Sequence, residues 1–243
     1  MTPEREYVTG IIRSVYESHG FEPFTGVEAT FQKTIDEDSK SVEADAILAV
    51  NETLKQLGIK NFAIYLSHHG VLIGILETIG VPAELHHKTF SAIRNFNKYN
   101  VEGFANELLE VGVSEKAAEI LLELFLKTDE ILNQEHDINR TVVTNLLNIV
   151  NNETLAELGQ ILQFTGRTPV LIDPALACEP PYSPGIVIEA RTSGLDILGS
   201  GGYVEEKTTV FAFTYDIEPI IELMESSGVF PTAIPASNTA AVL

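Results

Sequence analysis

The single cysteine of the sequence, Cys178, is the side chain with the strongest intrinsic nucleophilicity. Its reactive form is the thiolate, which an adjacent carboxylate disfavours, and Glu179 is the next residue along the chain. The surrounding sequence offers no adjacent base that could take up the thiol proton. We therefore expect no catalytic role for Cys178. A lone cysteine also excludes an internal disulfide and fits a reducing cytoplasm.

Two histidine doublets, His68-His69 and His86-His87, are of the residue type that binds metal ions. Adjacent residues point to different sides of a strand or helix, so neither doublet directs two imidazoles at one ion. No H-E-x-x-H or C-x-x-C spacing accompanies them. We interpret these histidines, together with His19 and His136, as structural or surface residues, and we predict no metal site.

The run Gly199-Ser-Gly-Gly202 is a candidate for a phosphate-binding loop. That loop requires the pattern G-x-x-x-x-G-K-[S/T], and no lysine follows these glycines at that spacing. We interpret the run as a glycine turn between strands.

The chain has 243 residues, and its 35 acidic and 15 basic residues give a formal charge of −20. The basic residues are scattered singly. Because proteins bind nucleic acids largely through Lys and Arg placed on phosphates, we expect no autonomous tRNA binding. No apolar run is long enough to cross a bilayer, and the N-terminus has no segment of signal-peptide type. We therefore expect a cytoplasmic protein without a membrane partner.

The periodicity of apolar residues predicts an α+β protein with a helical block in the middle of the chain. The patterns predict helices over residues 4–18, 44–57 and 216–226, and strands over 61–67, 169–172, 186–190 and 208–213. From about residue 83 to residue 164 the pattern is helical throughout. We therefore predict a discontinuous α+β core formed by 1–82 and 165–230, a helical insertion at 83–164 and a C-terminal tail at 231–243.

The most informative segment is Leu171-Ile-Asp-Pro-Ala-Leu-Ala-Cys-Glu-Pro-Pro-Tyr-Ser-Pro-Gly-Ile-Val-Ile-Glu189. It resembles the histidine-binding motif of class II histidyl-tRNA synthetases, D-P-x-L-A-R-G-L-D-Y-Y-T-G-x-V-F-E. Other segments resemble further parts of the family, in the family's order. Residues 15–28 resemble the dimer-forming motif 1, 32–48 the end of motif 2, 61–70 the N-F-x-I-x-x-N-H-R-G segment, 101–114 the insertion domain and 198–203 the G-G-R-Y-D turn. The resemblance implies a degenerate class II synthetase-like antiparallel sheet with helices, an inserted all-helical subdomain and a homodimer.

The resemblance also implies a ligand pocket. The family residues that contact the substrate histidine match Gln32, Asp36, Tyr182 and Tyr203. A carboxylate beside two phenols suits an imidazole or an amine, which needs a paired anion and a flat apolar wall. The alternative is that these residues are relics and the tyrosines only pack in the core, because the prolines in residues 180–184 must reshape the loop around Tyr182.

The departures from the family share one feature, which is the loss of cations that would bind ATP. The family's catalytic arginine falls on Cys178, its glycine-rich turn has no arginine in residues 201–204, and the ATP-binding arginine of its last motif falls on Ile217. The family segment that holds an adenylate-binding arginine, ahead of the position of Gln32, is absent. Losing one such group costs about 10²–10³-fold in rate. We therefore predict no catalytic residues, no cofactor and no aminoacylation.

Three functions are compatible with this pattern. The first is a catalytically inactive histidyl-tRNA synthetase-like protein, a dimeric binding, regulatory or scaffold module with a residual site for histidine or a similar small molecule. The second is a regulatory subunit resembling that of ATP phosphoribosyltransferase in histidine biosynthesis. The third is a still-active histidine–tRNA ligase that handles ATP with other residues.

Overall fold

The computed structural model describes residues 2–35, 41–94, 101–132, 152–176, 183–192, 196–205 and 209–231. The chain forms two compact units, one of residues 1–64, 164–169 and 188–243, and one of residues 65–163 and 170–187. In the described part of the chain, seven strands form one sheet with the order β1-β2-β7-β6-β5-β3-β4. The predicted α+β class is confirmed, and the strand pairs β1–β2, β2–β7 and β6–β7 are antiparallel as predicted.

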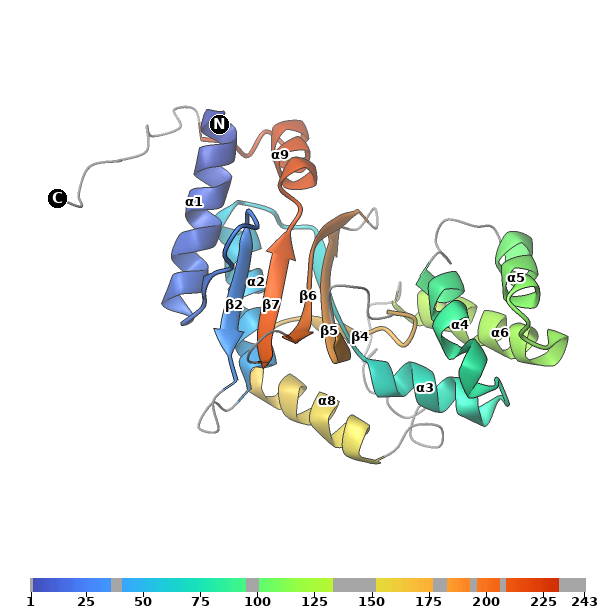
Figure 1. Cartoon of the computed structure of the whole chain (residues 1–243). Helices are drawn as coiled ribbons and strands as arrows, with labels where there is room; N and C mark the ends of the chain where they lie inside the picture. Colours follow the sequence, from blue (N-terminus) through green and yellow to red (C-terminus); the bar gives the residue numbers. More distant parts are fainter. Residues whose placement is uncertain are drawn as a thin grey trace. The chain divides into compact units, whose positions relative to one another are not determined.

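Among the described residues, most of the sheet and the three helices α1, α2 and α9 belong to the first unit. Its elements are α1 (Pro3–Ser18), β1 (Glu22–Pro23), β2 (Thr30–Thr34), α2 (Val42–Gln56), β6 (Ile197–Glu205), β7 (Thr209–Tyr215) and α9 (Ile217–Ser226). Strands β3 (Phe62–His68) and β5 (Ser183–Thr192) have residues in both units. Figure 1 shows α2 behind β2 and β7, so this helix covers one face of the sheet at these two strands.

Helix α1 has clear start and stop signals. The Thr2 hydroxyl accepts a hydrogen bond from the Arg5 amide at 3.3 Å, and Pro3 occupies the first turn, where no N–H group is needed. The helix ends before His19 and Gly20, and the φ of +79° at Gly20 is a conformation that favours glycine. The helix predicted over residues 4–18 is therefore confirmed.

The core of the first unit is an aromatic cluster centred on Tyr16 of α1. The ring centroid of Tyr16 lies 4.9 Å from that of Phe31, 5.2 Å from that of Phe21 and 5.7 Å from that of Tyr215. All four residues are buried. Because aromatic side chains bury large apolar areas, this cluster fixes α1 against β2 and β7.

The interpretation of residues 199–202 as a glycine turn is wrong. These residues lie inside β6, and the Phe213 ring of the neighbouring strand β7 lies over Gly199 and Gly201. A Cβ atom at Gly201 would lie 2.6 Å from the Phe213 ring and 2.8 Å from the Ala212 carbonyl oxygen. Glycine is therefore required here for close packing on a ring rather than for a turn.

The second unit consists mainly of helices. Its elements are α3 (His69–Thr78), η1 (Ala83–Leu85), α4 (His86–Arg94), α5 (Val101–Glu110), α6 (Glu115–Leu132), most of α8 (Asn152–Phe164) and β4 (Val170–Ile172). Phe104 of α5 and Phe125 of α6 pack together in its core with ring centroids 6.2 Å apart. The described residues of the predicted insertion, 83–164, are thus largely helical. None of the described helices combines the length and the apolar character that a membrane span requires.

Candidate functional site

Gln32 lies on β2 in the middle of the first unit's sheet. Gln32 is opposite Ala212 of β7, and Ala212 is opposite Gly202 of β6, with both strand pairs antiparallel. Residues opposite one another in neighbouring strands point to the same face of the sheet. On that face the Gln32 side-chain amide donates a hydrogen bond to Glu22 Oε1 of β1 at 3.2 Å.

Tyr203 points to the other face. It is opposite Phe211 of β7, which is in turn opposite Lys33 of β2, and the Tyr203 and Phe211 rings meet edge to face at 5.3 Å. Because successive side chains of a strand alternate between faces, Gln32 and Tyr203 lie on opposite sides of the sheet. Ser200, Gly202 and Val204 are the β6 residues that share the face of Gln32.

The structure therefore does not bring Gln32 and Tyr203 together. Asp36 and Tyr182 lie outside the described residues, as do Cys178 and Glu179. The predicted histidine-like pocket consequently stays a prediction, and its Tyr203 contact would have to come from the face opposite Gln32.

The Tyr203 hydroxyl donates a hydrogen bond to Glu43 Oε1 near the start of α2. The second oxygen of this carboxylate accepts a hydrogen bond from the Ser41 hydroxyl at 2.7 Å. Glu43 is only 8% exposed, and a negative charge is favourable in the first turn of a helix. Tyr203 thus joins β6 to α2 through a partly buried, charge-assisted hydrogen bond.

The partner of Tyr203 was missed in the sequence, although a signal was present. Glu43 occupies the same helical stripe as Ala46, Ile47 and Val50, all of which are fully buried. A carboxylate on an apolar stripe requires a hydrogen-bond donor inside the protein, because an unpaired charge is costly to bury. The stripe therefore indicated a donor for Glu43 without indicating which residue supplies it.

Lys33, one residue after Gln32, is a cation with a structural role. Its ammonium group donates hydrogen bonds to Asp45 Oδ2 at 2.7 Å and to the His19 carbonyl oxygen at 3.1 Å. It also lies 5.5 Å from the centroid of the Phe21 ring. These contacts join β2 to α2 and to the end of α1 on the face opposite Gln32, so this charge is not directed toward Gln32.

The side of the sheet that carries Gln32 has a neutral lining over the neighbouring strands β2, β7 and β6. We call it the Gln32 face and define it by nine paired residues of β2, β7 and β6: Thr30, Gln32, Thr34, Val210, Ala212, Thr214, Ser200, Gly202 and Val204. None of these nine residues is Lys or Arg. A polyphosphate needs cations or aligned N–H donors to hold its oxygens, and this lining supplies no cationic side chain.

Ile217 is the first residue of α9 and is 3% exposed. It is the position that the resemblance matches to the ATP-binding arginine of the family's last motif. Its side chain is part of the apolar core of the first unit, together with Ile220 and Met224 of the same helix. This position therefore serves packing.

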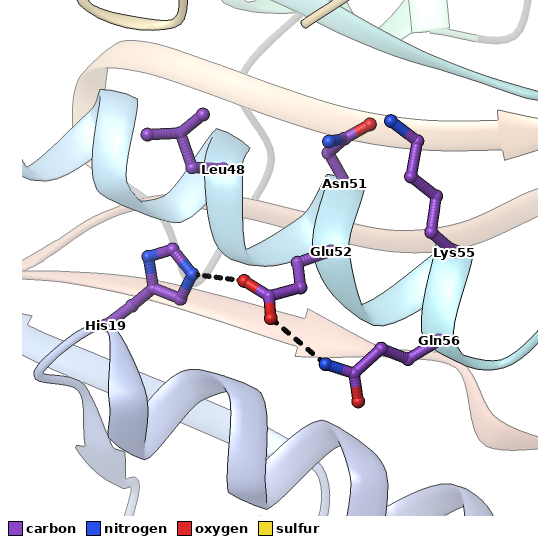
Figure 2. A pocket seen from close by; sticks show the side chains of 6 residues that line it. All are labelled: His19, Leu48, Asn51, Glu52, Lys55 and Gln56. Atoms are coloured by element: carbon purple, nitrogen blue, oxygen red, sulfur yellow. Dashed lines mark hydrogen bonds and ion pairs between the residues drawn. The ribbon is translucent and has the colours of Figure 1, made fainter.

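Figure 2 shows an open, shallow pocket of about 490 Å³ between the end of α1 and one side of α2. His19 Nε2 lies 2.9 Å from Glu52 Oε2, and the Gln56 amide donates a hydrogen bond to Glu52 Oε1 at 3.0 Å. The contact with His19 lowers the pKa of Glu52. Both carboxylate oxygens are thus engaged, so Glu52 is not placed as a general base.

Among the described residues, no group of three or more His, Cys, Asp and Glu side chains is arranged to hold a metal ion. His68 and His69 instead take part in the packing of α3, as described below. His19 is half-buried beside Glu52, and His87 is exposed on α4.

Comparison of the sequence with known proteins identifies relatives that match most of the chain. The chain is 28% identical over 203 residues to the cytoplasmic histidine–tRNA ligase of Dictyostelium discoideum, a match that covers 75% of this chain and 41% of that protein. It is 24% identical over 210 residues to the ATP phosphoribosyltransferase regulatory subunit of Trichormus variabilis, covering 80% of this chain and 49% of that protein. The chain thus spans between about two fifths and half of the length of these curated relatives.

A solved structure and a family model also match this chain. The crystal structure of histidyl-tRNA synthetase from Nostoc sp. PCC 7120 matches with a TM-score of 0.71 and 16% identity, covering 93% of this chain and 73% of that one. At that identity the likeness shows the fold. The sequence model of the family described as Histidyl-tRNA synthetase matches residues 25–211, which is more than half of the chain. The chain belongs to the histidyl-tRNA synthetase family.

Proposed function

We propose that this member of the family is a non-catalytic binding or regulatory module. The observation that carries the proposal is the neutral Gln32 face, on which none of the nine paired positions is a Lys or an Arg. Activation of an amino acid by ATP develops charge on phosphate oxygens, and fixed cations stabilise that charge. The nearby cation Lys33 is on the other face and is paired with Asp45.

Two substitutions inferred from the family resemblance support the same proposal. The buried Ile217 takes the position of one ATP-binding arginine, and Cys178 takes the position of the catalytic one. The effects of groups that act together are not additive, so several losses leave no useful rate. The net charge of −20 further opposes the approach of ATP and of tRNA.

Binding of ATP with magnesium, measured by isothermal titration calorimetry, tests the absence of a nucleotide site. We expect no heat of binding up to millimolar nucleotide. The histidine–tRNA ligase of Dictyostelium discoideum is the matched control, because its binding confirms that the conditions support nucleotide recognition. Saturable binding to the present protein at micromolar ATP would contradict the proposal.

A histidine-like ligand is the small molecule that we propose for the module, with Gln32, Asp36, Tyr182 and Tyr203 as its contacts. The supporting chemistry is the carboxylate and the phenols that suit an imidazolium group. Titration with histidine tests the site, with Gln32→Ala expected to weaken binding. Because Tyr203 points away from the Gln32 face, Tyr203→Phe shows whether that contact belongs to the site. If no heat of binding is measured up to millimolar histidine, only the scaffold role remains.

The second candidate is a regulatory subunit, which the 24% identity to the subunit from Trichormus variabilis favours. In this case the partner is an ATP phosphoribosyltransferase catalytic subunit. Affinity purification from the native host tests the candidate, because stable recovery of that subunit would support it. Absence of such a complex in cells that synthesise histidine would contradict it.

A homodimer is part of the proposal because residues 15–28 resemble the family's dimer-forming motif 1. Within that segment Val27 is 49% exposed, so the segment presents an apolar side chain to its surroundings. Light scattering over a range of protein concentrations tests the dimer, with Val27→Asp expected to shift the equilibrium toward monomer. A wild-type protein that remains monomeric at high concentration would contradict this part of the proposal.

A further inference from the structure

The imidazole of His68 caps the N-terminus of helix α3. His68 is the N-cap residue, and its Nδ1 accepts a hydrogen bond from the Gly70 amide at 2.9 Å. A ring nitrogen accepts a hydrogen bond only while it carries no proton. The proton of neutral His68 is therefore on Nε2, which lies 3.3 Å from Glu157 Oε2 of α8. Protonation of Nδ1 would place two donors against each other and remove the cap.

His69, the first residue of α3, also depends on being neutral. Its Nδ1 is buried and has no hydrogen-bond partner among the described residues. Its ring meets the edge of the Phe90 ring of α4 at 4.8 Å, and His86 lies on the same phenyl ring at 6.2 Å. Burial, together with the charges that His68 and His86 can carry, lowers the pKa of His69.

The first turn of α3 is tightly packed, so it has little space to rearrange when one of the two imidazoles gains a proton. A Cβ atom at Gly70 would lie 2.9 Å from both His68 Nδ1 and the Thr154 hydroxyl of α8, so glycine is needed for this close approach. The titratable groups that face the two rings in the described residues are Glu157 from α8 and His86 from α4. The Nε2 of His86 donates a hydrogen bond to the Val81 carbonyl oxygen at 3.0 Å, a contact that survives protonation.

We propose that His68 and His69 form a pH-sensitive element that holds the start of α3 against α4 and α8 at neutral pH and releases it in mild acid. When the contact opens, burial no longer lowers the pKa of His69, which returns to its ordinary value of about 6.5. The open form then binds more protons than the closed form below that pH, so the open population grows as the pH falls. Glu157 acts in the opposite direction, because its carboxylate favours a charged His68.

Hydrogen exchange at the Gly70 amide, followed by NMR, reports directly on the cap. Relative to the intrinsic exchange rate, we expect protection of this amide to fall on the order of tenfold between pH 7.5 and pH 5.5. The double variant His68→Asn, His69→Leu should lose this pH dependence, because Asn is a good N-cap that does not titrate. His87→Gln, on the exposed side of α4, is the matched control and should behave as the wild-type protein.

Two results of the exchange experiment would overturn the proposal. One is protection of Gly70 that stays constant or rises toward pH 5.5, which would mean that the Glu157 contact dominates. The other is a double variant that keeps the wild-type pH dependence. If the double variant does not fold, the single variant His68→Asn and the titration of the His69 Cε1 proton replace it. A His69 midpoint at or above 6.5 would also contradict the proposal.

Discussion

The substitution Tyr203→Phe removes one hydroxyl group and separates a structural role of Tyr203 from a role in ligand binding. In the structure the hydroxyl donates to Glu43, whose carboxylate is 8% exposed and keeps the Ser41 hydroxyl as its other partner. A hydrogen bond to a charged group contributes about 1.5–3 kcal/mol to stability. Because Glu43 would keep one of its two partners, we expect a loss of about 2 kcal/mol in the free energy of unfolding.

Urea unfolding measured by circular dichroism is the assay. With an m-value of about 2 kcal/mol/M, the midpoint of the first unit should fall by about 1 M. Tyr7→Phe is the matched control, because it removes the same atom from a side chain that packs on Phe230 without a hydrogen bond to its hydroxyl in the described structure. This control should stay within about 0.5 kcal/mol of the wild-type protein.

A double-mutant cycle with Glu43→Gln measures the coupling between the two side chains, which should be about 1–2 kcal/mol. A cost of less than about 0.5 kcal/mol for Tyr203→Phe, together with weaker binding of histidine, would contradict the structural role of this hydroxyl. That combination would mean that the hydroxyl faces a ligand rather than Glu43.

Further predictions concern packing and pH. Gly201→Ala should destabilise the first unit by about 2 kcal/mol or more, because its Cβ atom would meet the Phe213 ring and a backbone oxygen; an unchanged urea midpoint would contradict the packing described here. Arg5 donates to Glu28 and Glu218, and this contact lowers the pKa of Glu28. The contact should therefore stabilise the protein above about pH 4.5 and lose its effect as the pH falls further. In urea unfolding at pH 7, Arg5→Met should lower the midpoint less at high salt than at low salt, because salt screens the ion pair. A midpoint loss that is independent of salt would show that packing, not charge, carries the effect.

Local patterns predicted the elements whose signals are local. Thr2, Pro3 and Gly20 mark the ends of α1, and the apolar stripe of α9 is visible in Ile217, Ile220 and Met224. Strand β6 was missed because its glycines have the composition of a turn. Only the ring of Phe213 on the next strand explains why glycine is needed there, and that contact is invisible in the glycine run itself.

The candidate site was less predictable because it depends on the register in which strands β2, β7 and β6 pair. Gln32 is separated from its strand neighbour Ala212 by most of the chain, and a shift of one residue would exchange the two faces. The family resemblance matched Tyr203 to a ligand contact, whereas the register places Val204 on the face of Gln32. The partner of Glu43 is equally a long-range feature, since Tyr203 lies 160 residues further along the chain.

Histidine-dependent exchange of pyrophosphate into ATP tests most directly whether the chain activates an amino acid. The Dictyostelium discoideum ligase serves as the positive control in the same buffer. The neutral Gln32 face and the buried Ile217 predict no exchange above the background without histidine. A clear histidine-dependent signal from the purified protein would contradict the proposal of a non-catalytic module.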